Sequence, residues 1–70
     1  MTGGDVQRIR EELGMGRTEF ARALGFNGNS QTEARRMTRL EMGKMPVTND
    51  IMHRVLRLQR RRLAKLREEL

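Results

Sequence analysis

Helical periodicity in the apolar residues constrains the fold of this chain more than any other feature. Apolar side chains recur at spacings of three and four in each strong segment, and no run alternates between apolar and polar residues as a strand would. The first segment carries Val6, Ile9 and Leu13, and the second carries Phe20, Ala21 and Leu24. We therefore predict an all-α protein.

Glycine and proline mark the boundaries between the predicted helices. Gly14, Gly25 and Gly43 each follow an apolar segment, and glycine tolerates the left-handed conformation that commonly ends a helix. Pro46 breaks the chain again, and Thr48 is the expected N-cap of a helix that runs from about residue 49 to the terminus. Two short helices meet at the Gly25 turn, so we predict a compact orthogonal bundle with a long C-terminal helix.

Polar side chains indicate where two other helices begin. Asp5 is placed to cap the first helix. The segment Ser30-Gln31-Thr32-Glu33 has the pattern of a capping box, in which Ser30 and Glu33 each bind a backbone N–H at the helix start. The helix that this box opens is expected over residues 30–42.

The charge of the chain is concentrated in its second half. Residues 1–30 hold four Arg against four acids, whereas residues 31–70 hold eleven Arg and Lys against five acids and so carry the whole net charge of +6. Thirteen of the fifteen cations are Arg, whose guanidinium matches phosphate and the guanine edge. A solubilising surface is the alternative explanation. The one-sided, Arg-dominated distribution favours a polyanionic partner.

The residues that the chain lacks exclude several classes of protein. Seventy residues suffice for one small domain, and without Cys there are no disulfides or thiolate metal sites. His53 is the only His and Ser30 the only Ser, so neither a nucleophile–base pair nor a metal cluster can be assembled. We predict a protein that is not an enzyme and needs no metal, no cofactor and no evident small-molecule ligand.

Hydrophobicity indicates the cellular compartment of the protein, and aromatic content indicates which kind of nucleic acid it can bind. No apolar run approaches a membrane span and no signal-peptide core is present, so we expect a cytoplasmic protein that does not bind membranes. The chain has no Tyr or Trp, and Phe20 and Phe26 are expected in the core, which leaves no exposed aromatic ring to stack on bases. This favours duplex DNA over single strands, although it does not exclude contacts with RNA phosphates.

The predicted helix over residues 30–42 has two chemically different faces. At about 100° per residue, Ala34, Met37, Leu40 and Glu41 lie on one side. The opposite side carries Gln31, Thr32, Arg35 and Arg39, with Arg36 on the flank. Arg can bind guanine O6 and N7 bidentately, and Gln can do the same with adenine N6 and N7. A solvated charged face is the alternative, but the row also suits base contacts in a major groove.

Two stretches of the chain resemble a known family. They are "IREELGMGRTEFARALGF" from Ile9 and "MTRLEMGKMPV" from Met37, and their specific parts are Arg-x-x-Leu-Gly, Phe-Ala-x-x-Leu-Gly and Leu-Glu-x-Gly in that order. Over roughly residues 5–58 the chain resembles the Cro/C1-type (XRE-like) helix-turn-helix DNA-binding family, and in size it is similar to small repressors of phages and mobile elements. The resemblance implies a helix-turn-helix whose second helix enters the major groove.

The resemblance also assigns roles outside the base-reading face. Arg17 falls where the family often carries a residue that contacts the DNA backbone, and Arg10 and Glu41 fall where it commonly has a structural ion pair. The full set of expected phosphate contacts is Arg17, Thr18, Arg36 and Lys44. Two departures from the family stand out: Gly16 replaces the usual Ser or Thr N-cap, and the interval from residue 25 to residue 41 is longer by about one and a half turns. This insertion, at residues 27–31, weakens the transfer of base contacts at that end.

The last predicted helix carries two apolar stripes. Ile51, Val55 and Leu58 can close the core, whereas Leu56, Leu63, Leu66 and Leu70 continue beyond the reach of a single domain with heptad-like spacing. We expect a DNA-binding domain at residues 1–58 and a dimerisation extension at residues 59–70. A fraying tail and a membrane-surface helix are the alternatives.

Taken together, these features predict a homodimeric, sequence-specific regulator of double-stranded DNA, most simply a repressor or autorepressor of an inverted-repeat operator. The competing hypothesis is a protein-interaction module, such as an antitoxin-like adaptor whose C-terminal helix binds a partner protein. Sequence preference in duplex binding distinguishes the two.

Overall fold

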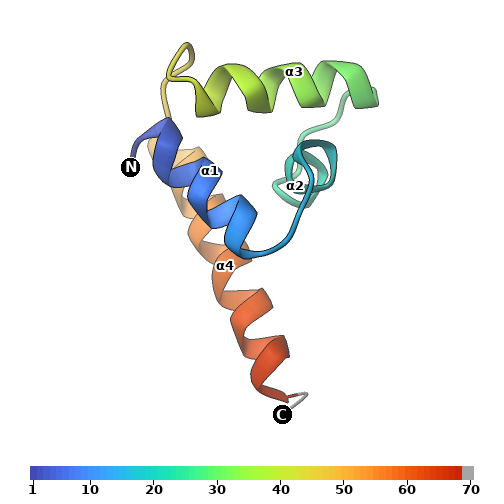
Figure 1. The fold of residues 1–70 in the computed structure, drawn as a ribbon, viewed down its shortest axis with the longest axis vertical. Coiled ribbons are helices and arrows are strands. Elements are labelled where there is room, and N and C mark those ends of the chain that lie inside the picture. The colour runs from blue at the N-terminus through green and yellow to red at the C-terminus, as the bar shows by residue number, and fades with distance from the viewer. Residues whose placement is uncertain (69–70) are drawn as a thin grey trace.

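Four helices make up the computed structural model, which describes residues 1–68 (Figure 1). They are α1 (Gly3–Glu12), α2 (Arg17–Ala23), α3 (Ser30–Glu41) and α4 (Asn49–Glu68), and no strand occurs among the described residues. In Figure 1, α3 lies across one end of the molecule, α2 is seen nearly end-on beneath it, and the C-terminal half of α4 projects at the opposite end. The predicted all-α orthogonal bundle with a long C-terminal helix is confirmed.

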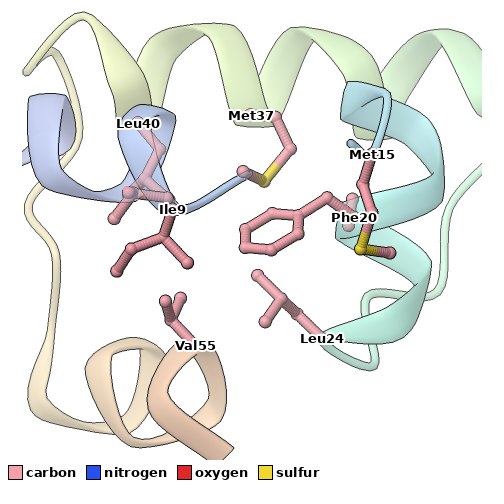
Figure 2. Packing of buried hydrophobic residues seen from close by; sticks show 9 residues of the cluster. Ile9, Met15, Phe20, Leu24, Met37, Leu40 and Val55 are labelled. Carbon is pink, nitrogen blue, oxygen red and sulfur yellow. The ribbon is translucent and has the colours of Figure 1, made fainter. Parts of the chain in front are cut away.

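Side chains from all four helices meet in one hydrophobic core (Figure 2). The largest fully buried side chains are Phe20, Met37, Leu40, Val6 and Val55. The first apolar stripe of α4 closes the core as predicted, since Val55 is buried and Ile51 and Leu58 are packed against it. The core therefore fixes which side of α3 is buried and which side faces solvent.

Glycines end three of the helices, as their positions predicted. Gly14, Gly25 and Gly43 have φ values of 68°, 92° and 81°, in the left-handed region that glycine adopts without steric cost. The break at Pro46 is followed by α4, whose start is capped by the Thr48 hydroxyl, 3.2 Å from the Ile51 nitrogen.

The two predicted N-terminal caps at Asp5 and Ser30 are wrong in register. Helix α1 begins earlier than expected, so Thr2 is its N-cap, and Asp5 is the third helical residue of a capping box with Thr2. The Thr2 backbone N–H donates to the Asp5 carboxylate at 2.9 Å, and this hydrogen bond lowers the pKa of Asp5. At α3 the cap is Asn29, whose side-chain oxygen lies 2.9 Å from the Thr32 nitrogen, and Ser30 is already helical.

The start of α1 lies directly against the end of α3. A Cβ atom on Gly3 would stand 2.8 Å from the Glu41 carbonyl oxygen and closer still to that of Leu40. Only glycine fits this approach, because the obstructing atoms are backbone atoms that cannot rotate away. The contact holds the C-terminal end of α3 in place.

Helix α4 is the longest element and extends past the rest of the bundle. Its 20 residues span about 30 Å. Leu63 and Leu66, from its second apolar stripe, are 47% and 55% exposed, Leu56 is half-buried, and Leu70 lies outside the described residues. Within residues 1–68, no helix combines the length and the apolar character needed to cross a membrane.

Candidate nucleic-acid interface

The outer face of α3 carries the side chains that were predicted to contact bases. Gln31, Thr32, Arg35 and Arg39 are all exposed. Thr32, Arg35 and Arg39 line one shallow hollow together with Arg36 and Met45. Within the described part of the chain, no ion pair or side-chain hydrogen bond engages Arg35 or Arg39. Their guanidinium groups are therefore directed at solvent and at any ligand that lies along α3.

Arg36 has a different environment from its two Arg neighbours. Its guanidinium carbon lies 5.2 Å from the centre of the Phe26 ring, in the loop between α2 and α3. A cation over an aromatic face is stabilised by about 0.5–1 kcal/mol at an exposed site. The contact restrains the Arg36 side chain at the edge of the α3 face, which is where a residue expected to contact a phosphate has to lie.

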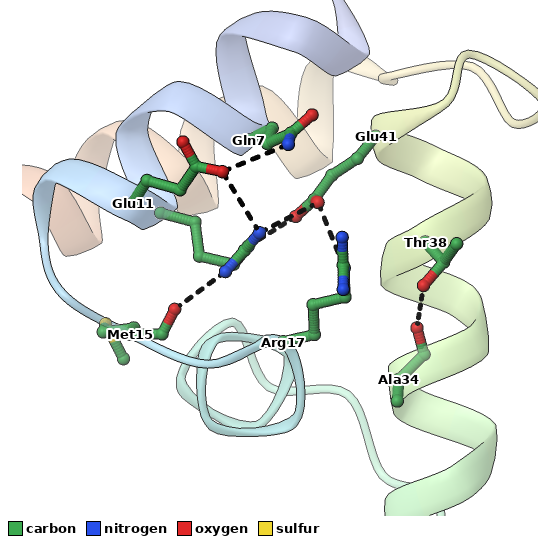
Figure 3. A network of polar contacts seen from close by, with 8 residues as sticks. Gln7, Glu11, Met15, Arg17, Ala34, Thr38 and Glu41 are labelled. Atoms are coloured by element: carbon green, nitrogen blue, oxygen red, sulfur yellow. Dashed lines mark hydrogen bonds and ion pairs between the residues drawn. The ribbon is translucent and has the colours of Figure 1, made fainter.

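A buried network joins α1, α2 and α3 behind this face (Figure 3). Arg10 Nε and Nη2 donate to the two carboxylate oxygens of Glu41 at 2.7 and 3.2 Å, and Arg10 Nη1 donates to the Met15 carbonyl at 3.0 Å. The side chains of Arg10 and Glu41 are 10% and 2% exposed. These are the two residues for which the resemblance implied a structural ion pair, and the bidentate geometry fits that role.

Arg17 and Thr18, both expected to contact phosphates, already have partners within the protein. Arg17 Nε donates to the Glu41 carboxylate at 3.3 Å, while the side chain stays 44% exposed. The Thr18 hydroxyl donates to the Ser30 carbonyl at 3.3 Å, so its proton links the first turn of α2 to the first turn of α3. Lys44 is exposed just after α3. Of the expected phosphate contacts, Arg17 keeps an accessible guanidinium and Thr18 acts as a link between helices.

Glu33 and Arg22 form a contact that the sequence analysis missed. Glu33 is 2% exposed, and its carboxylate accepts from the Gly28 backbone N–H at 2.8 Å and from Arg22 Nε at 3.2 Å. Arg22 also donates to the Ser30 hydroxyl at 3.1 Å. Glu33 lies four residues before Met37 and seven before Leu40, which places it on the buried side of the helix. This spacing could have predicted that Glu33 is buried. This contact fixes the connection between α2 and α3 and orients the N-terminal end of α3.

The exposed side chains of this surface are mainly basic and polar, which suits recognition of an anion. Among residues 1–68, no three His, Asp or Glu side chains are grouped as metal ligands. Every buried side-chain nitrogen and oxygen in that part of the chain has a hydrogen-bond partner. Compared with protein-family models, with curated proteins and with solved structures, the chain gives no match.

Proposed function

We propose that this protein is a sequence-specific double-stranded DNA-binding regulator of transcription, most simply a dimeric repressor, that inserts α3 into the major groove. One observation carries the proposal: the inner face of α3 is held by the core, while its outer face presents Arg35 and Arg39 to solvent without a side-chain partner among residues 1–68. The major groove is about 12 Å wide and accepts a helix about 10–12 Å across. Helix α2 crosses beneath α3 in the order expected of a helix-turn-helix (Figure 1).

The surrounding residues support this docking of α3. Arg36 lines the same hollow as Arg35 and Arg39, and the exposed Lys44 follows the C-terminal end of α3, where its backbone N–H donates to the Arg39 carbonyl at 2.9 Å. Both cations are therefore available for phosphates of a bound duplex. The accessible guanidinium of Arg17 lies at the first residue of α2 and adds a third positive charge. We propose that Arg35 and Arg39 contact bases, together with Gln31 and Thr32 at the N-terminal end of α3. We propose that Arg17, Arg36 and Lys44 contact phosphates.

We propose a dimer because one recognition helix contacts too few base pairs to select a specific DNA site. One recognition helix contacts only a few base pairs, and two-fold binders place two such helices in half-sites about 34 Å apart. The exposed Leu63 and Leu66 on the projecting half of α4 supply an apolar surface for the pairing of two chains. We therefore propose an inverted-repeat operator.

The proposal is tested by selecting bound sequences from a random duplex pool and then comparing variants on the selected site. Arg35→Ala and Arg39→Ala should fold normally, lose about 1–3 kcal/mol each at that site and relax the base preference at one position each. Arg8→Ala is the matched control, because Arg8 is an exposed α1 residue whose ion pairs with Asp5 and Glu12 are on the surface. A pool that shows no preferred sequence, or α3 variants that bind like Arg8→Ala, refutes the proposal.

The competing function is a protein-interaction module that uses the same exposed leucines of α4. Leu63 and Leu66 are the observation in its favour, since an apolar helix face also suits a partner protein. Duplex binding would then ignore sequence and would be insensitive to Arg35→Ala. The selection experiment therefore separates the two functions.

A further inference from the structure

A second group of basic side chains lies on α4, away from the α3 face. His53, Arg57, Arg60 and Arg61 are exposed and line one shallow hollow. An adjoining groove is lined by His53, Arg57 and Arg61 together with Ala23 and Leu24 at the end of α2. Spacings of four, seven and eight residues place these side chains on one side of the helix. We call His53, Arg57, Arg60 and Arg61 the α4 basic stripe.

The arginines of this stripe have no acidic partner in the described part of the chain, whereas their neighbours on α4 do. Arg54 pairs with Asp50 at 3.1 Å and donates to the Leu24 carbonyl at 2.9 Å, and Arg62 pairs with Glu19 at 3.6 Å. No ion pair within residues 1–68 involves Arg57, Arg60 or Arg61. Asp50, the acid that lines the groove, is already engaged by Arg54.

Like charges at these spacings destabilise the helix that carries them. Arg57 repels Arg60 and Arg61 at separations of three and four residues, where side chains on a helix are neighbours. A bound anion removes this repulsion. The stripe is therefore a surface whose electrostatic energy is lowered by a ligand.

The stripe and the α3 face are separate surfaces. Figure 1 shows α3 across one end of the molecule and α4 running away from it to the other end. Arg61 lies twelve residues after the start of α4, which is about 18 Å along the helix. A duplex seated along α3 does not follow the axis of α4, so the stripe is available to a second ligand.

We propose that the α4 basic stripe binds the phosphate backbone of a second DNA duplex, so that the protein holds two duplex segments at once. From His53 to Arg61 the stripe extends about 12 Å, and along that length of its axis a duplex lying parallel to α4 carries three to four phosphates on each strand, at an axial rise of about 3.4 Å each. Arginine binds phosphate oxygens in a bidentate fork, and none of the residues that line the two hollows is Phe, Tyr or Trp, the larger aromatic rings that usually stack on bases. The contact is therefore independent of base sequence.

An acidic protein is a poorer fit than a nucleic acid. Protein interfaces depend on apolar anchors at their centre. Met1, Met42, Leu63 and Leu66, the exposed large hydrophobic side chains within residues 1–68, line neither the groove nor the hollow. Leu24 and Leu58 line the groove, but Leu24 is buried in the core and Leu58 is half-buried against it, so neither is free to anchor a partner. Charge without apolar anchors is the pattern of backbone binding by counterion release.

The experiment is a bridging assay with the full chain. Beads carrying a selected operator duplex of about 20 base pairs are saturated with protein, and a fluorescent duplex of unrelated sequence is added. Wild-type protein should recruit the second duplex. Arg57→Gln/Arg61→Gln should still bind the beads but recruit the second duplex only weakly. The slope of log affinity against log salt for that duplex should fall in magnitude by about 1.8, or 0.9 for each phosphate contact. The control Arg8→Gln/Arg67→Gln removes the same charge from exposed positions outside the stripe and should behave as wild type.

The outcomes separate this proposal from the proposed function of α3. Recruitment that is absent in wild type, or equal in the two double variants, overturns the second site. A glutamate polymer that competes as well as a duplex of equal charge overturns the assignment to nucleic acid. If the selection finds no operator, the beads carry a duplex of arbitrary sequence. An Arg35→Ala/Arg39→Ala protein should then still bind a duplex through the α4 basic stripe. Adding Arg57→Gln and Arg61→Gln to that protein should remove this binding.

Discussion

Replacing Glu41 by Ala removes the carboxylate that joins α1, α2 and α3. In the native protein this carboxylate is 2% exposed and holds the guanidinium of Arg10, whose side chain is 10% exposed. Without it, Arg10 keeps the Met15 carbonyl at 3.0 Å and a 3.9 Å approach to the exposed Glu11 carboxylate. An uncompensated buried charge of this kind costs roughly 3–5 kcal/mol. Because Arg10 keeps these two weaker contacts, we expect the free energy of unfolding to fall by about 3 kcal/mol, the lower end of that range.

That loss is large for a chain of this size. Seventy residues correspond to a total stability of roughly 4–10 kcal/mol, at about 0.05–0.15 kcal/mol per residue. A domain of this length loses about 4–8 °C in Tm for each kcal/mol, so Glu41→Ala should melt at least about 12 °C below wild type. Far-UV circular dichroism during heating and urea titration measures both quantities.

Two further variants make this test specific to the buried ion pair. Glu11→Ala removes an exposed acid near the same arginine and should change stability by less than about 0.5 kcal/mol. Arg10→Met/Glu41→Leu removes both buried charges of this pair and should be more stable than Glu41→Ala alone. The reasoning is refuted by a Glu41→Ala protein within about 1 kcal/mol of wild type, because Glu41 would then behave as a solvated surface residue.

Three other perturbations have defined outcomes. Leu66→Asp should give a folded but monomeric protein in analytical ultracentrifugation, since Leu66 is exposed on the projecting half of α4, and a protein that stays dimeric places the interface elsewhere. Gly3→Ala should destabilise by about 1–3 kcal/mol in urea because its methyl group meets the carbonyl oxygens at the end of α3, whereas Gly4→Ala meets only a hydroxyl at 3.7 Å and should be neutral or stabilising. The pKa of Asp5 lies below its ordinary value of 3.8, mainly because of a backbone hydrogen bond, so its contribution is fully present above about pH 5 and is lost as the pH falls through the folded pKa. The stability difference between wild type and Asp5→Asn should therefore be constant above about pH 5 and shrink below it.

The helices and the orientation of α3 were predictable because they depend on local periodicity. Met37 and Leu40 lie three residues apart on the apolar stripe, and once that stripe is placed in the core the opposite face, with Arg35 and Arg39, must point outward. The left-handed Gly25 was predictable for the same reason, since one residue type decides the local conformation.

Contacts between elements far apart in the sequence were not predictable in this way. Arg54 and the Leu24 carbonyl are thirty residues apart, and nothing in either segment indicates that one caps the helix that ends at the other. The N-cap of α3 was assigned to Ser30 instead of Asn29 because both residues are good N-caps. The Glu33 carboxylate, which accepts from the Gly28 N–H inside the protein, favours Asn29 as the cap. Local propensity allowed two registers, and tertiary contacts selected one.

The buried Glu33 carboxylate limits how the connection between α2 and α3 can change in evolution. Its hydrogen bond to the Gly28 N–H exists only because the connection is long enough to fold back over the first turn of α3. A related chain with a shorter connection would lose that donor, and a buried acid held by Arg22 alone is costly. Loop length and the residue at position 33 are therefore expected to covary among related sequences, with an acid in long-loop chains and an apolar residue in short-loop ones.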